Sequence, residues 1–74
     1  MDSGYDKQVG QVVRKIRIER NLTQEQLAAK LQVAGCDVTR SALAKIEVGQ
    51  RYIYLDELKA LRQILSVEYG DLLC

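Results

Sequence analysis

The fold of this chain is decided by two stretches, TQEQLAA at residues 23–29 and RSALAKIEVG at residues 40–49. In the first, Thr23 precedes Gln26 by three residues, which is the spacing of a capping box. The threonine hydroxyl accepts from the Gln26 amide, and the glutamine side chain reaches back to the start of the helix. A helix is therefore predicted from Gln24, with Leu27, Ala28 and Leu31 buried.

The second stretch has the features of another short helix. Thr39 is a suitable N-cap, and Gly49 is a suitable stop, because glycine readily adopts the left-handed conformation that ends many helices. Helical spacing puts three apolar side chains on the inner side: Ala42, Leu43 and Ile46. A helix is predicted to run through Val48, followed by a loop at residues 50–54.

The flanking segments are also helical in pattern. Residues 7–20 repeat apolar side chains at helical spacing (Val9, Val12, Val13 and Ile16). A fourth helix begins near Asp56 and Glu57, acids that favour a first turn, and carries an inner stripe of Leu58, Leu61, Ile64 and Leu65. Residues 69–73 predict a final short turn of helix. The expected fold is all-α, a compact bundle of four helices plus a short fifth, with residues 1–6 as a flexible N-terminus and residues 7–74 as one domain.

Length and composition exclude several classes of protein. Seventy-four residues bury only about 60% of the surface that the unfolded chain exposes, so one thin core is expected. No run of about 18 apolar residues exists to span a membrane, and the first residues are polar and acidic, so we expect a soluble, cytoplasmic protein. Without histidine, neither a metal site nor a cofactor is expected, and Cys36 and Cys74 do not make a disulfide framework.

The charge distribution is more informative than the formal net charge of +1. Residues 38–54 carry Arg40, Lys45 and Arg51 against Glu47, which gives 3 − 1 = +2. Residues 55–74 carry two basic and four acidic side chains, which gives 2 − 4 = −2. A basic middle and an acidic tail are expected when one face meets phosphate and the other does not.

These motifs resemble the phage-repressor and Cro-like helix-turn-helix family, also called XRE-type, from Val9 to Leu73. Its strongest parts are Ile16-Arg17, residues 22–28, residues 43–49, and the closing Leu65, Val67 and Leu72. The resemblance implies a lambda-repressor-like domain that binds a double-stranded DNA operator. It implies that the second helix of the motif lies with its N-terminal part in the major groove, where base edges are distinguishable.

The resemblance also assigns roles to individual residues. It implies base reading by Arg40, Ser41 and Lys45, with Arg40 able to pair bidentately with a guanine. It implies phosphate contacts by Gln24, Thr39, Gln50 and Arg51, of which Arg51 is the leading candidate. The alternative for the readers is that three polar side chains only solvate an exposed face, and Gln24 has the same alternative.

Two further residues match an architectural feature of the family. Arg17 and Glu47 correspond to a partly buried ion pair that ties the first helix to the end of the recognition helix. If Glu47 were exposed, it would be a solvated acid instead. Tyr52 and Tyr54 contact either DNA or the helix that follows them.

The connection between the motif helices departs from the family pattern. The family joins them by a turn of a few residues, whereas about five more lie between Leu31 and Val38 here, approximately Gln32 to Cys36. Either the second helix is longer and ends at Gly35, or the connection loops out. Cys36 falls in this insertion and is either an apolar filler or a redox sensor, while Cys74 is positioned to cross-link two chains under oxidising conditions.

Two functions of different classes follow from the sequence. The first is a sequence-specific transcriptional regulator, a repressor that acts as a homodimer on a DNA operator. Candidate dimer contacts are Tyr69, Leu72 and Leu73 together with the outer side of the fourth helix, and the alternative is a simpler role in closing the core. The second is a protein-interaction module, an antitoxin-like partner or coactivator, which keeps the fold without operator reading. An enzyme is disfavoured, because no histidine, paired carboxylates or glycine-rich phosphate loop is present, and no small-molecule substrate or membrane partner is expected.

Overall fold

A computed structural model describes residues 3–73, which form five helices and no strand. They are α1 (Ser3–Glu19), α2 (Gln24–Val33), α3 (Arg40–Glu47), α4 (Leu55–Leu65) and α5 (Tyr69–Leu73). The predicted all-α bundle of four helices and a short fifth is confirmed. Met1, Asp2 and Cys74 lie outside the described residues, and so does the cross-link predicted at Cys74.

The first helix is longer than its sequence pattern predicts. α1 begins at Ser3 rather than near residue 7, because the apolar repeat that locates a helix starts only where the helix meets the core at Val9. The helical turns before Val9 have no apolar stripe to reveal them. The flexibility expected of residues 1–6 stays a prediction.

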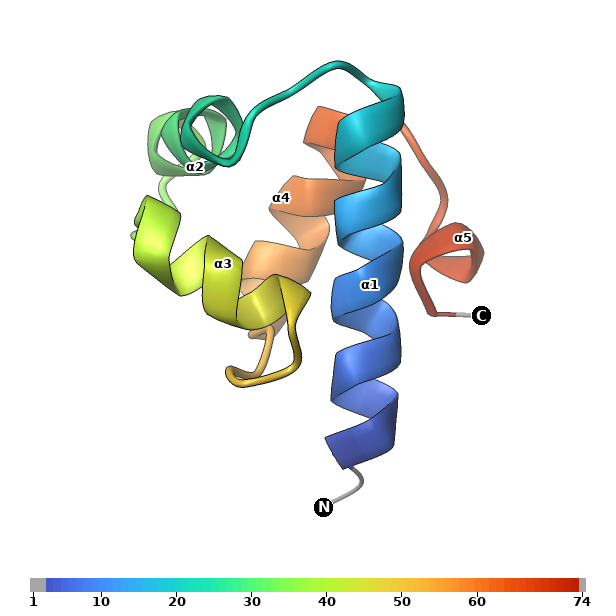
Figure 1. Cartoon of the computed structure of the whole chain (residues 1–74). Coiled ribbons are helices and arrows are strands. Elements are labelled where there is room, and N and C mark those ends of the chain that lie inside the picture. Colours follow the sequence, from blue (N-terminus) through green and yellow to red (C-terminus); the bar gives the residue numbers. More distant parts are fainter. Residues whose placement is uncertain (1–2, 74) are drawn as a thin grey trace.

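The helices pack around α1, which stands between α5 on one side and α2 and α3 on the other (Figure 1). Side chains from all five helices fill one core beneath them. Its largest fully buried members are Val13, Leu27, Leu31, Val38, Leu43, Ile46, Leu61, Leu65 and Leu72. Since Leu72 is 0% exposed, α5 closes this core with that side chain, and Leu72 is not the dimer contact that the sequence offered as one alternative.

Helices α1 to α4 all end in the same way. Each is followed by one residue with positive φ: Asn21, Gly35, Gly49 and Ser66. After each of these, the next amide donates back across the last turn; after Gly35, for example, the Cys36 amide donates to the Leu31 carbonyl at 2.9 Å. This is the Schellman arrangement, which satisfies carbonyls that a helix end leaves unpaired. The repeated stop keeps the helices short and lets the chain turn sharply between them.

The longer connection between α2 and α3 is thereby explained. α2 ends at Val33, Gly35 turns the chain with a φ of +92°, and Cys36 is returned to the core. The Gln32 side chain closes the turn by donating to the Val38 carbonyl at 3.1 Å. Burial raises the pKa of the Cys36 thiol, and the charges of Asp56 and Glu57 add to the effect, so the thiol stays protonated and fills space.

One glycine, which no sequence motif singled out, sets the distance between α1 and α3. A Cβ at Gly10 would overlap the carbonyl oxygen of Ile46, and it would lie 3.0 Å from the Ile46 carbonyl carbon. These are backbone atoms, so they cannot swing aside as a flexible side chain does. Gly10 therefore permits α1 to touch the last turn of α3 directly.

Among the helices described between residues 3 and 73, none combines the length and the apolar character that crossing a membrane requires.

Candidate nucleic-acid interface

The start of α3 is fixed by its cap. Thr39 has extended backbone angles, φ −79° and ψ 168°, and its Oγ1 accepts from the Ala42 amide at 3.1 Å. Arg40 and Ser41 are consequently the first two helical residues. The Thr39 hydroxyl keeps its proton for donation to another group, because the cap uses the oxygen only as an acceptor.

The two sides of α3 are chemically distinct. Leu43, Ile46 and Glu47 are buried against the other helices. Arg40, Ser41 and Lys45 are exposed on the opposite side. Within the described part of the chain, neither Arg40 nor Lys45 forms an ion pair or a side-chain hydrogen bond. Two cationic groups and a hydroxyl are therefore presented to solvent on a short helix whose other side is anchored in the core.

The anchor is a buried polar network on Glu47. Arg17 of α1 donates to both Glu47 carboxylate oxygens, from Nε at 2.7 Å and from NH2 at 3.1 Å. Arg17 NH1 also donates to the Leu22 carbonyl at 2.8 Å. The guanidinium therefore binds both α3 and the connection that follows α1. Arg17 and Glu47 thus do form the ion pair expected of them, and the exposed alternative for Glu47 does not apply.

Gln24 joins the same network from α2. Its Nε2 donates to Glu47 Oε1 at 3.1 Å, a contact that the sequence did not reveal. A glutamine amide carries two N–H groups, so one hydrogen remains for a phosphate while the other holds the side chain in place. The half-buried Gln24 is therefore positioned by α3 before any ligand arrives.

Arg51 has intramolecular partners that the sequence did not predict. Its NH1 and NH2 donate to the two carboxylate oxygens of Glu57 at 2.8 and 2.9 Å, and NH1 also donates to the Tyr52 carbonyl at 2.9 Å. The guanidinium carbon lies 5.2 Å from the centre of the Tyr54 ring. Glu57 neutralises the charge of Arg51 and takes part of its donors, so the phosphate contact expected of Arg51 stays a prediction.

Glu57 is the residue that the sequence analysis underestimated. It is buried at the start of α4, and besides Arg51 it accepts from the Tyr54 amide at 3.0 Å. The hydrogen bonds from Arg51, followed by the Tyr54 amide, hold the pKa of the Glu57 carboxyl below its usual range against the opposing effect of burial. The available signal was the spacing from Arg51 to Glu57 across the loop, but such a spacing is equally compatible with two solvated side chains.

The remaining predicted contacts lie near α3. Gln50 is exposed just beyond the end of the helix, where its backbone amide donates to the Lys45 carbonyl at 2.8 Å. Thr39 directly precedes α3 in the sequence, and Gln50 follows shortly after its end. The structure places no ligand against any of these residues, so their roles on DNA remain proposals.

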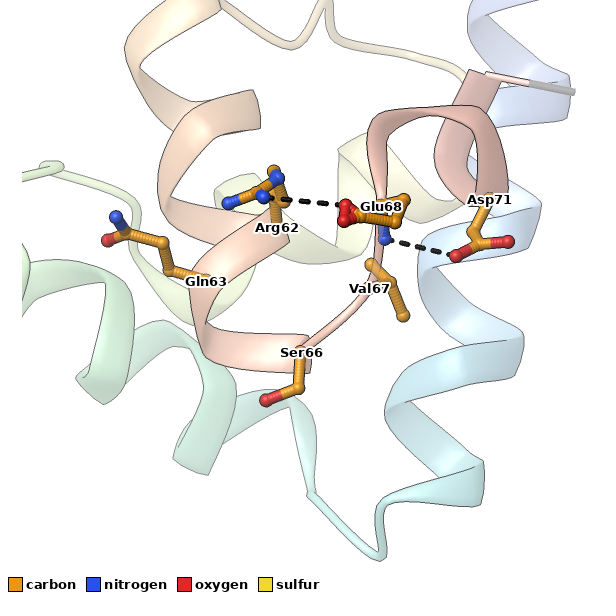
Figure 2. Close-up of a pocket in the computed structure, with 6 residues that line it drawn as sticks. All are labelled: Arg62, Gln63, Ser66, Val67, Glu68 and Asp71. Carbon is orange, nitrogen blue, oxygen red and sulfur yellow. Dashed lines mark hydrogen bonds and ion pairs between the residues drawn. The ribbon is translucent and has the colours of Figure 1, made fainter.

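A polar groove between α4 and α5 has the opposite character (Figure 2). Arg62 reaches across it to Glu68 at 3.4 Å, and Asp71 accepts from the Glu68 amide at 3.0 Å. Two acids face one base here, and that base already has an acidic partner. The groove is therefore unsuited to phosphate, in agreement with the acidic tail seen in the sequence.

Comparison with known proteins agrees with this architecture. A family model described as helix-turn-helix matches residues 13–72, and this covers nearly all of the motif and its supporting helices. The chain belongs to the helix-turn-helix family. The match makes it a DNA-binding regulator of transcription, in line with the sequence prediction.

Several members of the helix-turn-helix family are similar to this chain. Control protein C.BamHI of Bacillus amyloliquefaciens is 38% identical over 65 residues, covering 86% of this chain and 74% of that protein. The HTH-type transcriptional activator BcrR of Enterococcus faecalis is 38% identical over 61 residues, but the chain spans only 28% of its length.

Two solved structures share the fold. The DNA-binding domain of BldD has a TM-score of 0.81 and 27% identity over the whole of both chains. The restriction-modification controller protein C.AhdI from Aeromonas hydrophila has a TM-score of 0.81 and 30% identity, covering 97% of this chain and 99% of that one.

Proposed function

We propose that this protein is a sequence-specific repressor that reads an operator with the first turns of α3. Arg40 donates bidentately to a guanine, Ser41 contacts a neighbouring base edge, and Lys45 reaches a base acceptor one turn further along. The observation that carries the proposal is the contrast between the two sides of α3. One side carries cationic tips that have no partner among the described residues, and the other carries the buried Glu47 anchor.

The phosphate contacts that we propose are Gln24, Thr39 and Gln50. Gln24 offers its second amide hydrogen, Thr39 its hydroxyl proton, and Gln50 its side-chain amide. The first amides of α2 add to the attraction. N–H groups at the start of a helix have no partner within the helix, and they form the positive end of its dipole, which attracts phosphate. These donors fix the orientation of α3 in the groove, while the base contacts select the sequence. Arg51 stays a further candidate phosphate contact, although its guanidinium is paired with Glu57.

Repression is proposed because occupying an operator is sufficient to exclude another protein from the same DNA. This role requires neither catalysis nor a cofactor, and it places the protein in the cytoplasm with its DNA. One relative is named a transcriptional activator, so activation is the competing direction. The direction of regulation is therefore tested by transcription in vitro, with the selected operator placed over or beside a promoter.

Base reading is tested by selecting duplexes from a random library with the wild-type protein and then repeating the selection with Arg40→Ala. The expected result is loss of preference at one base pair, worth about 1 to 3 kcal/mol, with other positions unchanged. Lys59→Ala serves as the control, because Lys59 is an exposed cation on α4, outside the proposed interface. An Arg40→Ala protein that selects the wild-type sequence would show that Arg40 does not read bases.

One observation favours the protein-interaction alternative. With Arg51 neutralised by Glu57, the DNA-facing side has fewer free cations than the sequence suggested. Titration of duplex binding against salt separates the alternatives, because each phosphate neutralised by a cation steepens the fall in affinity. The interaction module is the better description if no random-library duplex is enriched at low salt.

A further inference from the structure

The loop that connects α3 to α4 carries an arginine whose hydrogen-bonding groups are only partly used. A guanidinium has five N–H groups. In Arg51, NH1 donates to Glu57 Oε1 at 2.8 Å and to the Tyr52 carbonyl at 2.9 Å, and NH2 donates to Glu57 Oε2 at 2.9 Å. Among the described residues, no partner accepts from Nε or from the second hydrogen of NH2.

The two unused N–H groups lie on the same edge of the guanidinium. Glu57 binds between NH1 and NH2, so it takes the NH2 hydrogen that points towards NH1. The other NH2 hydrogen points in the same direction as the Nε hydrogen, because the guanidinium is planar. Two parallel N–H groups of this kind bind two oxygens of one phosphate or carboxylate. We call them the Nε–NH2 edge of Arg51.

The Nε–NH2 edge is open to solvent. The Arg51 side chain is 24% exposed. Of the buried side-chain nitrogens and oxygens between residues 3 and 73, only Arg62 Nε lacks a hydrogen-bond partner, so the unpartnered Nε of Arg51 is not buried. Arg62 also pairs with an acid, Glu68 (Figure 2), and its guanidinium carbon lies 5.2 Å from the centre of the Tyr69 ring. Only Arg51, however, keeps an Nε that a ligand can reach.

The orientation of this edge is fixed from two directions. Glu57 is buried in the first turn of α4 and also accepts from the Tyr54 amide at 3.0 Å, so its carboxylate is held in place. The guanidinium carbon of Arg51 lies over the Tyr54 ring, 5.2 Å from its centre. An arginine normally loses rotamer freedom when it binds a ligand, but here that loss has largely occurred on folding. The Nε–NH2 edge is therefore preorganised.

This edge is also tied to the recognition helix. The Gln50 amide donates to the Lys45 carbonyl at 2.8 Å, and Arg51 is the next residue, in the loop that leaves the end of α3 (Figure 1). The proposed phosphate contact Gln24 is held in a similar way, because the buried Glu47 accepts one of its amide hydrogens and leaves the other. In both cases a buried acid orients a donor that keeps a free N–H group.

We propose that Glu57 is a positioning residue for DNA binding: it holds Arg51 so that the Nε–NH2 edge binds two oxygens of one operator phosphate. This inference rests on the proposed function for its ligand. The charge of Arg51 is balanced by Glu57, so the contact acts through oriented hydrogen bonds and releases few counterions from the DNA. It depends on the planar shape of the guanidinium, which a lysine side chain does not reproduce.

The test compares Arg51→Lys with Arg62→Lys in the full chain. Lysine keeps the charge and still pairs with an acid, but its ammonium group has no second planar edge. Fluorescence anisotropy measures binding to a library-selected duplex and to a mixed-sequence duplex over a range of salt concentrations. Arg51→Lys should bind both duplexes about 10-fold more weakly, with an unchanged slope of log K against log salt. Arg62→Lys should change neither quantity, since the Nε of Arg62 is buried.

Glu57→Gln tests the positioning role through a quantity that stability alone does not change. Glutamine does not accept from both NH1 and NH2 of Arg51, because its own amide nitrogen is a donor. Arg51 is then released with its charge unbalanced, so the slope of log K against log salt should steepen by about 0.9, the value for one neutralised phosphate. An unchanged slope in a variant shown by circular dichroism to be folded would refute the positioning role.

The inference and the proposed function fail in different ways. Wild-type affinity in Arg51→Lys, or equal losses in Arg62→Lys, would overturn the phosphate contact and leave operator reading by α3 intact. Equal wild-type affinity for the selected and mixed-sequence duplexes, with weaker binding of both by Arg51→Lys alone, would refute operator reading and support the phosphate contact.

Discussion

Replacing Gly10 with alanine tests how α1 holds the recognition helix. The added methyl group would overlap the Ile46 carbonyl oxygen, so either α1 or the last turn of α3 must move by on the order of 1 Å. Overpacking of this kind costs about 1 to 3 kcal/mol, and the backbone partner puts the cost at the upper end. Alanine recovers about 1 kcal/mol of helix propensity. The expected net loss in free energy of unfolding is about 2 kcal/mol.

Gly70→Ala is the matched control, because the same substitution at Gly70 meets no atom within 4 Å. Gly70 lies in α5, so alanine there gains propensity without overlap. Urea unfolding followed by circular dichroism should show opposite signs for the two variants. Thermal unfolding should show a fall of about 8 to 16 °C for Gly10→Ala, since 1 kcal/mol corresponds to roughly 4 to 8 °C in a domain of this size.

Gly10→Ala should also weaken duplex binding at a temperature where the variant remains folded. The reason is that Gly10 contacts the end of α3 that Arg17 and Glu47 also hold, and displacement of this end rotates the exposed side of the helix. A Gly10→Ala protein as stable as Gly70→Ala would refute the close approach of α1 and α3. A destabilised variant with wild-type duplex affinity would refute only its link to DNA reading.

Two further predictions concern a helix end and a buried acid. Ser66→Gly should raise the free energy of unfolding by about 0.5 to 1 kcal/mol in urea, because Ser66 has a φ of 57° that glycine adopts without strain, whereas Gln63→Gly inside α4 should lower it. The Glu57 carboxyl has a lowered pKa when folded, so its stabilisation is present above the unfolded value near pH 4.3 and is lost as the pH falls through the folded pKa. Glu57→Gln should therefore lower stability at pH 7 by about 1 to 3 kcal/mol and flatten the decline below about pH 4.3, whereas the exposed Glu19→Gln should do neither. An equal acid-side decline in wild type and Glu57→Gln would show that the pair with Arg51 does not stabilise the fold.

The sequence predicted the helices well where local chemistry determines them. Thr23, Gln26 and Thr39 cap helices through contacts within three residues, and the structure contains each of these contacts. Gly35 and Gly49 stop helices for an equally local reason, the left-handed backbone that follows the last turn. Such features depend on neighbours along the chain, and these are visible in a sequence.

The sequence was less informative where partners are distant or space is limiting. The importance of Gly10 depends on a backbone 36 positions later in the chain, which no local pattern reveals. Gln24 meets Glu47 only because α2 and α3 are packed together. Arg51 was assigned to phosphate because an arginine after a recognition helix fits that role by resemblance, and no local pattern predicted its pair with the buried Glu57.

The pair between Arg51 and Glu57 also bears on the salt dependence of DNA binding. With Arg17 and Arg51 held by acids, Lys45 and Arg40 are the cations that α3 itself presents, and Arg40 is assigned to a base. Lys45 is also assigned to a base, so few cations beside α3 are free to neutralise phosphates and a shallow salt dependence is expected. The pairing of Arg51 with Glu57 thus lowers the number of free cations beside α3, and a steep fall of duplex affinity with salt would contradict this reasoning.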